Sequence, residues 1–303
     1  MGGGGWEFAW GGQDDRHSIA GILRALDLGV NWIDTAAVYG MGHSEEVVAR
    51  ALQAWRGPRP YVLTKCGLRW DAAGKTRREF TAQSIRQECE DSLRRLGTNV
   101  IDLYQIHWPP QDSGPGLEDA WATMAALQRE GKVRWIGVSN FDEVEIRRAD
   151  AIAPVTSLQA PYSLIRRDVE VTTLPHCQRH GIGAVSYSPM ASGLLTGSMT
   201  PARAAVLPPG DFRSRRAEFH EPALSRHLAL VDRLRRVGER HGRLPGEIAI
   251  AWVLRNPTIT GAIVGVRSAQ QADQIMSAVD LKLSDKEVAE IEGSLSMVRQ
   301  SVA

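Results

Sequence analysis

Three consecutive apolar segments of the sequence end in side chains suited to acid–base chemistry: Asp34 with Tyr39 just beyond it, then Lys65, then His107. A free phenol has a pKa of about 10 and is a weak acid at neutral pH. A lysine ammonium beside it stabilises the phenolate and lowers that pKa, and a carboxylate keeps the lysine charged and in place. An imidazole can position a carbonyl oxygen or share its proton. Together these groups are suited to protonating a carbonyl oxygen.

We predict that Tyr39 is the proton donor and that Lys65 tunes its acidity. Asp34 would hold the lysine, and His107 would position the carbonyl. Each residue alone has an ordinary structural explanation, such as a packed tyrosine, a structural salt bridge or a hydrogen-bonded core histidine. Their joint placement favours catalysis, because the carboxyl ends of parallel strands in a barrel share one rim.

The elements that would position these side chains follow an alternating pattern. Short apolar segments, typical of strands buried on both faces, are separated by longer amphipathic ones. The predicted strands cover residues 31–38, 60–66, 100–107, 133–139, 156–160, 183–188 and 262–266. The predicted helices between them cover 15–28, 44–55, 81–96, 117–130, 142–152 and 169–180, and two more cover 224–241 and 246–255. Residues 198–222 are predicted to form a long loop.

This alternation predicts an α/β fold with one domain over residues 1–303. A doubly wound dinucleotide fold would carry a G-x-G-x-x-G motif between its first strand and helix, and the sequence has none there. A (β/α)8 TIM barrel is therefore favoured. Only seven strands are predicted, and the glycines at 2–5 are poor strand formers. We expect a barrel that lacks its first strand, is open beside residues 31–38 and has reduced stability.

Composition narrows the classes of partner. Lysine and arginine number 36 and aspartate and glutamate 35, a net charge of +1 that gives no reason to expect nucleic acid or an anionic membrane as a partner. The three scattered cysteines have no metal-like spacing, so no metal site is expected, and their sparse use fits a reducing cytoplasm. The N-terminus does not read as a signal peptide. A cytoplasmic location is expected.

Several ordered sequence blocks resemble the aldo-keto reductase superfamily, of the bacterial type. They are NWIDTAAVYG at 31–40, GHSEE at 42–46, DSLRRLG at 91–97, IDLYQIHW at 101–108, GKVRWIGVSNF at 131–141, YSPMASGLL at 187–195 and GVRS at 265–268. The resemblance spans about residues 14–295 and implies a (β/α)8 barrel that reduces an aldehyde or ketone with NADPH held on the rim. It also places the tetrad at the four residues argued above.

The resemblance further implies a set of cofactor-binding residues. Ser139, Asn140 and Gln159 would bind the nicotinamide carboxamide, and Tyr187 would stack on the nicotinamide ring. The residues that match the pyrophosphate loop and a further phosphate contact are Ser188, Met190, Gly193, Leu194 and Arg213. Those that match the adenosine end are Gly265, Arg267 and Gln271.

Cofactor preference depends on few positions. Arg267 could pair with a 2′-phosphate, which favours NADPH, with NADH as the alternative. Two positions depart from the family pattern: Ser198 stands where many relatives have a phosphate-binding lysine, and Ile275 where an asparagine often contacts the adenine. Tryptophans near the rim predict a pocket for an aromatic or apolar carbonyl; they are Trp6, Trp10, Trp70 and Trp108.

Two other functions remain as alternatives. A Schiff-base lyase would use Lys65 as its nucleophile at a barrel strand end. A non-catalytic barrel would sense nicotinamide or bind a partner protein. The residues that match the nicotinamide site argue against the lyase, and the intact tetrad argues against a complete loss of activity.

Overall fold

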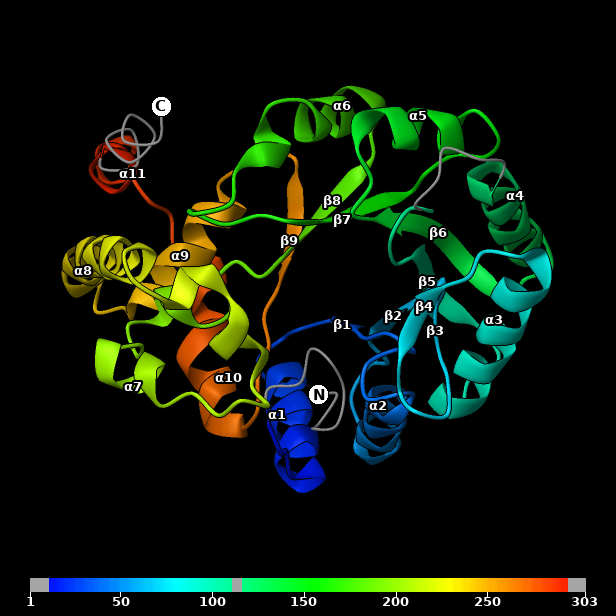
Figure 1. Ribbon diagram of the computed structural model, residues 1–303, viewed down its shortest axis with the longest axis horizontal. Helices are drawn as coiled ribbons and strands as arrows, with labels where there is room; N and C mark the ends of the chain where they lie inside the picture. Colours follow the sequence, from blue (N-terminus) through cyan, green and yellow to red (C-terminus); the bar gives the residue numbers. More distant parts are fainter. Residues whose placement is uncertain (1–10, 111–115, 294–303) are drawn as a thin grey trace.

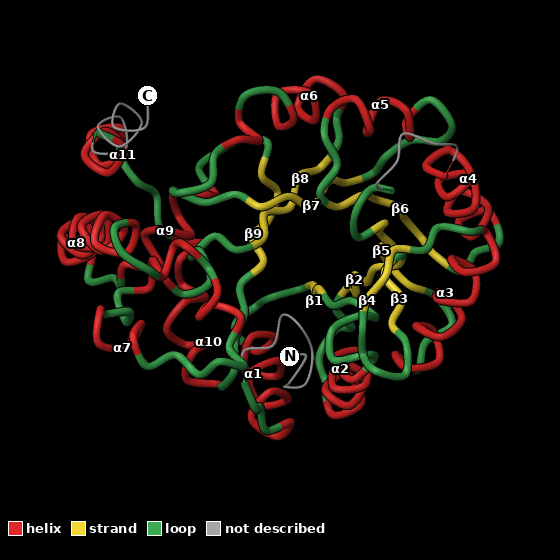
Figure 2. Tube along the Cα trace, viewed as in Figure 1, coloured by secondary structure: helices red, strands yellow, loops and turns green. Residues whose placement is uncertain are grey.

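The computed structural model describes residues 11–110 and 116–293, so Trp6 and Trp10 lie outside the described residues. Strands form an inner ring and helices surround it (Figures 1 and 2). The main sheet consists of β1 (Trp32–Asp34), β2 (Tyr61–Cys66), β5 (Ile101–Ile106), β6 (Val133–Ser139), β7 (Ser157–Pro161), β8 (Gly183–Tyr187) and β9 (Ile259–Ile263). The strands lie side by side in that order, and every neighbouring pair is parallel.

The sheet is a nearly closed barrel of the (β/α)8 type, which confirms the predicted fold class. All seven predicted strands are present, and β5 is buried along its whole length, as a continuous apolar segment predicts. Within the described residues the strand order ends at β1 on one side and β9 on the other, with no eighth strand between them. The described part of the chain therefore has the expected open edge.

A tryptophan lies across this open edge. Trp32 of β1 approaches Gly261 of β9 so closely that a Cβ atom on the glycine would lie 2.8 Å from the indole Cζ2. Side-chain packing thus joins the two terminal strands where no backbone ladder joins them.

Two predicted strands differ from those observed. β1 ends at Asp34, four residues earlier than predicted, because the chain then turns, and Tyr39 N donates to the Ala36 carbonyl. β9 ends at Ile263 and begins three residues earlier than predicted, since Ile259 pairs with Ala184 of β8. In both cases β-branched residues continue past the end of the strand: Thr35 and Val38 after β1, and Val264 and Val266 after β9.

A two-stranded antiparallel hairpin follows β2, and the sequence analysis missed it. It consists of β3 (Leu68–Trp70) and β4 (Thr76–Arg78). Its turn is held by Asp71, whose carboxylate accepts from the backbone N–H groups of Ala73 and Lys75 at 2.9 Å each. In β3 an arginine stands between two apolar residues, and β4 consists of a threonine and two arginines. The strands are also largely half-buried, so they carry little hydrophobic signal.

Helices cover the outside of the strand ring. They are α1 (Asp15–Asp27), α2 (His43–Ala54), α3 (Ala82–Leu96), α4 (Gly116–Arg129), α5 (Glu143–Asp150), α6 (Thr173–His180), α7 (Pro201–Ala205), α8 (Ala223–His241), α9 (Pro245–Leu254), α10 (Ala269–Ile275) and α11 (Asp285–Glu292). Short 3₁₀ helices are η1 (Asp168–Glu170), η2 (Leu194–Thr196), η3 (Phe212–Arg215), η4 (Ala217–Phe219) and η5 (Met276–Asp280). The predicted loop at 198–222 thus contains α7, η3 and η4. None of the described helices is long and apolar enough to cross a membrane.

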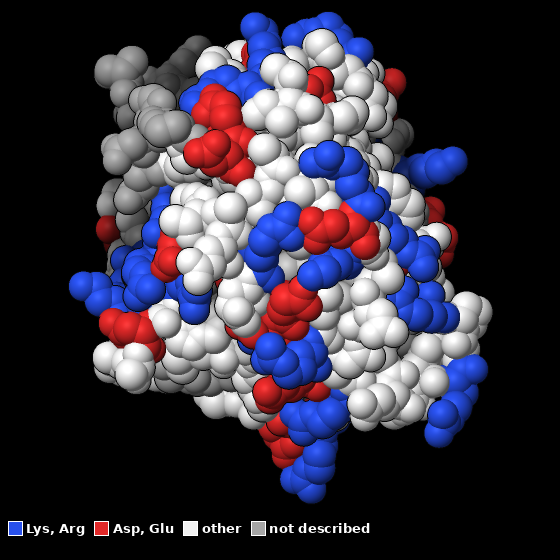
Figure 3. All heavy atoms as spheres, turned by 90° about the vertical axis from the view of Figure 1, so that its right-hand side faces the viewer, with Lys and Arg blue, Asp and Glu red and all other residues white. Residues whose placement is uncertain are grey.

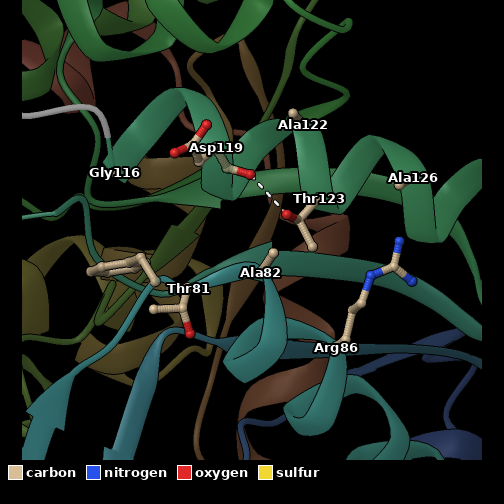
Figure 4. A pocket seen from close by; sticks show the side chains of 9 residues that line it. Thr81, Ala82, Arg86, Gly116, Asp119, Ala122, Thr123 and Ala126 are labelled. Atoms are coloured by element: carbon tan, nitrogen blue, oxygen red, sulfur yellow. Dashed lines mark hydrogen bonds between the residues drawn. The ribbon is translucent and has the colours of Figure 1, made fainter.

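Two surface features lie away from the strand ends. A groove of about 710 Å³ runs between α3 and α4 and is lined largely by small or apolar side chains (Figure 4). No member of the tetrad lines it. The face that carries these helices mixes basic and acidic side chains without a large area of one sign (Figure 3).

Candidate active site

The structure brings the four predicted catalytic residues together at the carboxyl ends of adjacent strands. Asp34 is the last residue of β1, Lys65 is the second-last of β2, and His107 directly follows β5. Tyr39 lies in the turn after β1. Because β1, β2 and β5 are neighbours in the sheet, strands far apart in the sequence bring these side chains to one place.

A buried ion pair forms the base of the site. Lys65 Nζ lies 2.7 Å from Asp34 Oδ2, and the two side chains are 0% and 5% exposed. The same ammonium donates to the Thr35 carbonyl at 2.8 Å. A buried charge is tolerated only when it is paired and hydrogen-bonded, and these contacts satisfy that requirement.

Tyr39 lies between the lysine and the histidine. Its hydroxyl is 3.5 Å from His107 Nε2, and the two rings meet edge to face with centroids 5.5 Å apart. Lys65 Nζ lies 5.2 Å from the centre of the Tyr39 ring. The phenol is thus close to a fixed positive charge and to an imidazole that can share a hydrogen bond with it.

The protonation states follow from burial and from these neighbours. Burial raises the pKa of Tyr39, and the positive charge of Lys65 opposes this rise without cancelling it. Burial alone would lower the pKa of Lys65, but Asp34 and, to a smaller extent, Tyr39 together outweigh it and leave the pKa above its ordinary value. Burial and then the Lys65 charge hold the pKa of His107 well below its usual range. At neutral pH the site holds a neutral phenol, an ammonium and a neutral imidazole.

A second group of polar side chains lies beside the tetrad. Asn140, with a positive φ of 64°, donates to the His107 carbonyl at 2.9 Å and to Ser139 Oγ at 3.1 Å. Its Oδ1 accepts from the Tyr187 hydroxyl at 2.7 Å. Gln159 Nε2 donates to Asp34 Oδ1 at 2.7 Å, so this group is hydrogen-bonded directly to the tetrad.

The loop after β8 has an unusual backbone. Its positive-φ residues are Ser188, Ala191, Ser192 and Gly193. Left-handed residues in such turns form concavities lined by backbone N–H groups, which bind anions. Arg213 lies over this loop, since a Cβ on Gly193 would be 3.7 Å from its Nη1. Its Nε and Nη2 donate to Asp211, and Nη2 lies 2.6 Å from the carboxylate. The predicted Met190 and Leu194 belong to the same loop.

The predicted adenosine-end residues lie together beyond β9. The Arg267 guanidinium donates to the Gly12 carbonyl at 2.6 Å and to Gln13 Oε1 at 2.8 Å. Its backbone N–H donates to Gln271 Oε1. Arg267 and Gln271 are exposed, as is Gly265, where a Cβ atom would meet open space.

Both described rim tryptophans lie near the β3–β4 hairpin. Trp70 ends β3, and Trp108 directly follows His107 and packs against the Arg78 guanidinium at 5.5 Å. The hairpin turn reaches the segment after Tyr39, because a Cβ on Gly74 would lie 3.2 Å from Met41 Sδ. The hairpin therefore lies beside the turn that carries Tyr39.

Comparison with known proteins identifies the family. The family model described as "Aldo/keto reductase family" matches residues 1–296. The chain belongs to the aldo/keto reductase family. A curated relative, aldo-keto reductase YhdN of Bacillus subtilis (strain 168), is 35% identical over 285 residues, covering 93% of this chain and 84% of that protein.

Two further relatives show the range of this family. The NADH-specific methylglyoxal reductase of Escherichia coli (strain K12) is 32% identical over 289 residues, covering 91% of this chain and 87% of that protein. The solved structure of the glycerol dehydrogenase AKR11B4 from Gluconobacter oxydans has a TM-score of 0.88 and 36% identity, covering 98% of this chain and 89% of that one. Aldo/keto reductases are oxidoreductases that use nicotinamide cofactors and act on small carbonyl compounds.

The residues present fit the nicotinamide that this family uses. The side-chain amide N–H of Gln159 donates to Asp34, so its Oε1 remains to accept from a carboxamide N–H. Ser139 accepts from Asn140, which leaves its hydroxyl proton for a carboxamide oxygen. The two side chains thus keep one donor and one acceptor, the pair that a planar carboxamide would need.

Sequence reasoning missed part of the aldo/keto reductase rim. A pocket of about 470 Å³ adjoins Tyr187 and Ser188 and is also lined by Arg166, Arg216 and His227. Arg166 and Arg216 come from two separate loops and His227 from α8, and they share no motif, so only the fold brings them together. The Thr35 carbonyl that accepts from Lys65 was also missed, because backbone groups carry no sequence signal.

Proposed function

We propose that this chain reduces an aldehyde or ketone with a reduced nicotinamide cofactor, and that Tyr39 donates the proton. The observation that carries the proposal is the burial of Lys65 between Asp34 and Tyr39, 2.7 Å from the carboxylate. Family membership supports carbonyl reduction in general terms. The bound reduced nicotinamide would supply the hydride that reaches the carbonyl carbon.

The tetrad residues then divide the proton chemistry. Neutral Tyr39 would donate its proton to the carbonyl oxygen, and Lys65 would stabilise the phenolate that remains. Neutral His107 would orient the oxygen by a hydrogen bond, because its low pKa keeps it uncharged. Asp34 would hold the lysine in place and charged. Ser139, Asn140 and Gln159 would fix which face of the nicotinamide meets the substrate.

The preferred cofactor in this proposal is NADPH. Arg267 is exposed beyond β9 and could meet a 2′-phosphate bidentately once it leaves Gly12 and Gln13. NADH is the alternative, since one relative is named as NADH-specific. Calorimetric titration of the wild type and Arg267→Ala with both cofactors tests this. Equal loss of affinity for NADPH and NADH in the variant would contradict a role in reading the phosphate.

Removal of the phenol hydroxyl tests the reaction. Tyr39→Phe should bind the cofactor as the wild type does and lose at least about a hundredfold in the rate of reduction, the lower range for general acid catalysis. The readout is oxidation of the nicotinamide with a panel of aromatic, apolar and sugar-like aldehydes and ketones. Wild-type turnover of none of them, or full activity of the variant, would overturn the proposal.

The same experiments separate the alternatives. A Schiff-base lyase needs a neutral lysine, whereas the pKa of Lys65 is raised, because the charges and hydrogen bonds of Asp34 and Tyr39 together outweigh the effect of burial. A nicotinamide-sensing barrel would bind cofactor but show no Tyr39-dependent turnover. We also propose a cytoplasmic location, which the three buried, free cysteines suit.

A further inference from the structure

A peptide group beside the tetrad is hydrogen-bonded on both sides. The Cys66 carbonyl accepts from the His107 N–H at 3.0 Å. The Gly67 N–H, which belongs to the same peptide group, donates to Glu88 Oε2 at 3.0 Å. An unbroken row of hydrogen bonds therefore connects a carboxylate on α3 to the backbone of a tetrad residue.

Glu88 is a buried carboxylate with neutral donors. It is 6% exposed, and its other oxygen, Oε1, accepts from the Ser84 hydroxyl at 3.2 Å. Among the described residues it has no salt-bridge partner within 4.0 Å. The charge of Arg69 on β3 favours its ionised form, and that of Glu79 opposes it. A buried charge held only by neutral groups is costly, so its presence needs an explanation.

The peptide that Glu88 holds has little freedom. Gly67 has a φ of +87°, and a Cβ atom there would lie 2.5 Å from Phe80 Cε1. The catalytic candidate Lys65 directly precedes this Cys66–Gly67 peptide. The strand β3, which ends at Trp70, directly follows it. The orientation of one peptide thus affects the lysine, the histidine and the hairpin together.

We propose that Glu88 is a positioning residue for the reductase reaction: through the Cys66–Gly67 peptide, its carboxylate holds the backbone of His107 in place against Tyr39. A negative charge at one end polarises the peptide and strengthens the hydrogen bond at the other. This inference rests on the proposed function. It extends the candidate active site to α3, a helix that carries none of the predicted catalytic or cofactor-binding residues.

Three variants of the full chain test the role. Glu88→Gln keeps the shape and one acceptor for Gly67, whereas Glu88→Leu removes the acceptor. Glu247→Leu is a matched control, because Glu247 of α9 is also buried and accepts from the Leu244 N–H at 2.8 Å and the Ser277 hydroxyl at 2.7 Å. Both leucine variants lose an acceptor for a backbone N–H and for a hydroxyl. Glu247→Leu also loses the ion pair with Arg243 at 3.2 Å, but only Glu88 is linked to His107.

Glu88→Leu should lower kcat by at least about tenfold with little change in KM, since small misplacements of catalytic groups have such effects. Glu88→Gln should recover most of that loss. It should also remove from the kcat–pH profile a step near neutral pH, where burial places the pKa of Glu88 at about 7. The polar and titratable groups that interact with Glu88 are Ser84, Cys66, Tyr104, Arg69 and Glu79. Wild-type kcat in Glu88→Leu, or an equal loss in Glu247→Leu, would overturn the inference.

An NMR readout separates this inference from the proposed function. The amide protons of Gly67 and His107 should shift and lose protection in Glu88→Leu, whether or not the protein reduces a carbonyl. If the wild type reduces no carbonyl but these amides respond, only the proposed function fails. If the wild type is active and neither the amides nor kcat respond, only the role of Glu88 fails.

Discussion

Gln159 Nε2 donates to Asp34 Oδ1 at 2.7 Å, on the carboxylate oxygen that Lys65 does not use. The carboxylate is therefore shared between the ammonium of the tetrad and the amide expected to hold the nicotinamide. Proton transfer and cofactor binding, which the sequence analysis assigns to separate residues, thus both depend on Asp34. Loss of either partner should disturb both.

Gln159→Met tests this sharing. It keeps the length of the side chain but removes the donor to Asp34 and the acceptor for a carboxamide. Loss of one such buried hydrogen bond costs about 1–3 kcal/mol, so cofactor affinity should fall by about tenfold or more, with kcat also reduced. Calorimetry with NADPH and steady-state rates measure the two effects.

A matched control for Gln159→Met lies two strands away. Gln105 of β5 is fully buried, and neither atom of its amide has a hydrogen-bond partner among the described residues. Gln105→Met should be neutral or stabilising, because it removes an unsatisfied polar group. If both variants weaken cofactor binding equally, the link between Gln159 and Asp34 has no special role.

The buried ion pair predicts strong coupling in stability. Asp34→Asn would leave the Lys65 charge buried without its carboxylate, which costs about 3–5 kcal/mol. Adding Lys65→Met to it removes that charge, so the double variant should be more stable than the sum of the single variants predicts. Urea unfolding of the four proteins gives the coupling free energy. Additive losses would mean that the pair contributes little.

The state of the phenol predicts a simple titration. Because burial raises the pKa of Tyr39 above its ordinary value of 10.0, the free protein should hold Tyr39 neutral throughout the physiological range. The difference in tyrosinate absorbance between the wild type and Tyr39→Phe should stay flat up to about pH 10. If Tyr39 instead titrated near pH 7, the Lys65 charge would lower its pKa by more than burial raises it.

Glu88 predicts a pH dependence of stability. Burial raises its pKa from 4.5 to about 7 in the folded chain, so between these values the folded state binds a proton that the unfolded state has released. The contribution of Glu88 to stability is therefore complete below pH 4.5 and declines as pH rises to about 7. The loss is about 3 kcal/mol at higher pH.

Glu88→Gln cannot titrate and should not show this decline. The free energy of unfolding of the variant minus that of the wild type should thus grow by about 3 kcal/mol from pH 4.5 to pH 8. Urea unfolding at several pH values measures this difference, in which the contributions of other groups cancel. A constant difference would show that the carboxyl has an ordinary pKa.

Much of the fold follows from sequence because its strands are buried on both faces. Their apolar segments stand out from the amphipathic helices, as the fully buried β5 shows. The β3–β4 hairpin does not stand out, since its strands are half-buried and carry Arg69, Arg77 and Arg78. The early end of β1 also lacks a signal, because Ala36, Ala37 and Val38 remain apolar while the chain turns.

The candidate site also has a part that sequence predicts and a part that it does not. The tetrad can be predicted because its residue types stand at the ends of recognisable strands. The bond between Asp34 and Gln159 spans 125 positions, and that between Gly67 and Glu88 joins a loop to a helix face. Such contacts depend on how strands and helices pack in three dimensions. Helical spacing places Glu88 on the buried face of α3 with Ile85 and Ser92, but no local pattern shows that its partner is the Gly67 N–H.

The contact between Trp32 and Gly261 has a consequence for how the molecule loses activity. Strands in the middle of the sheet have a backbone ladder on each side. Within the described part of the chain, β1 has a ladder on one side and, on the other, the contact of its Trp32 ring with β9. Local opening at this end needs less free energy than global unfolding. Asp34 lies on the strand that would open, while His107 follows one that would stay closed. Partial opening would therefore separate the halves of the tetrad in a molecule that is otherwise still folded.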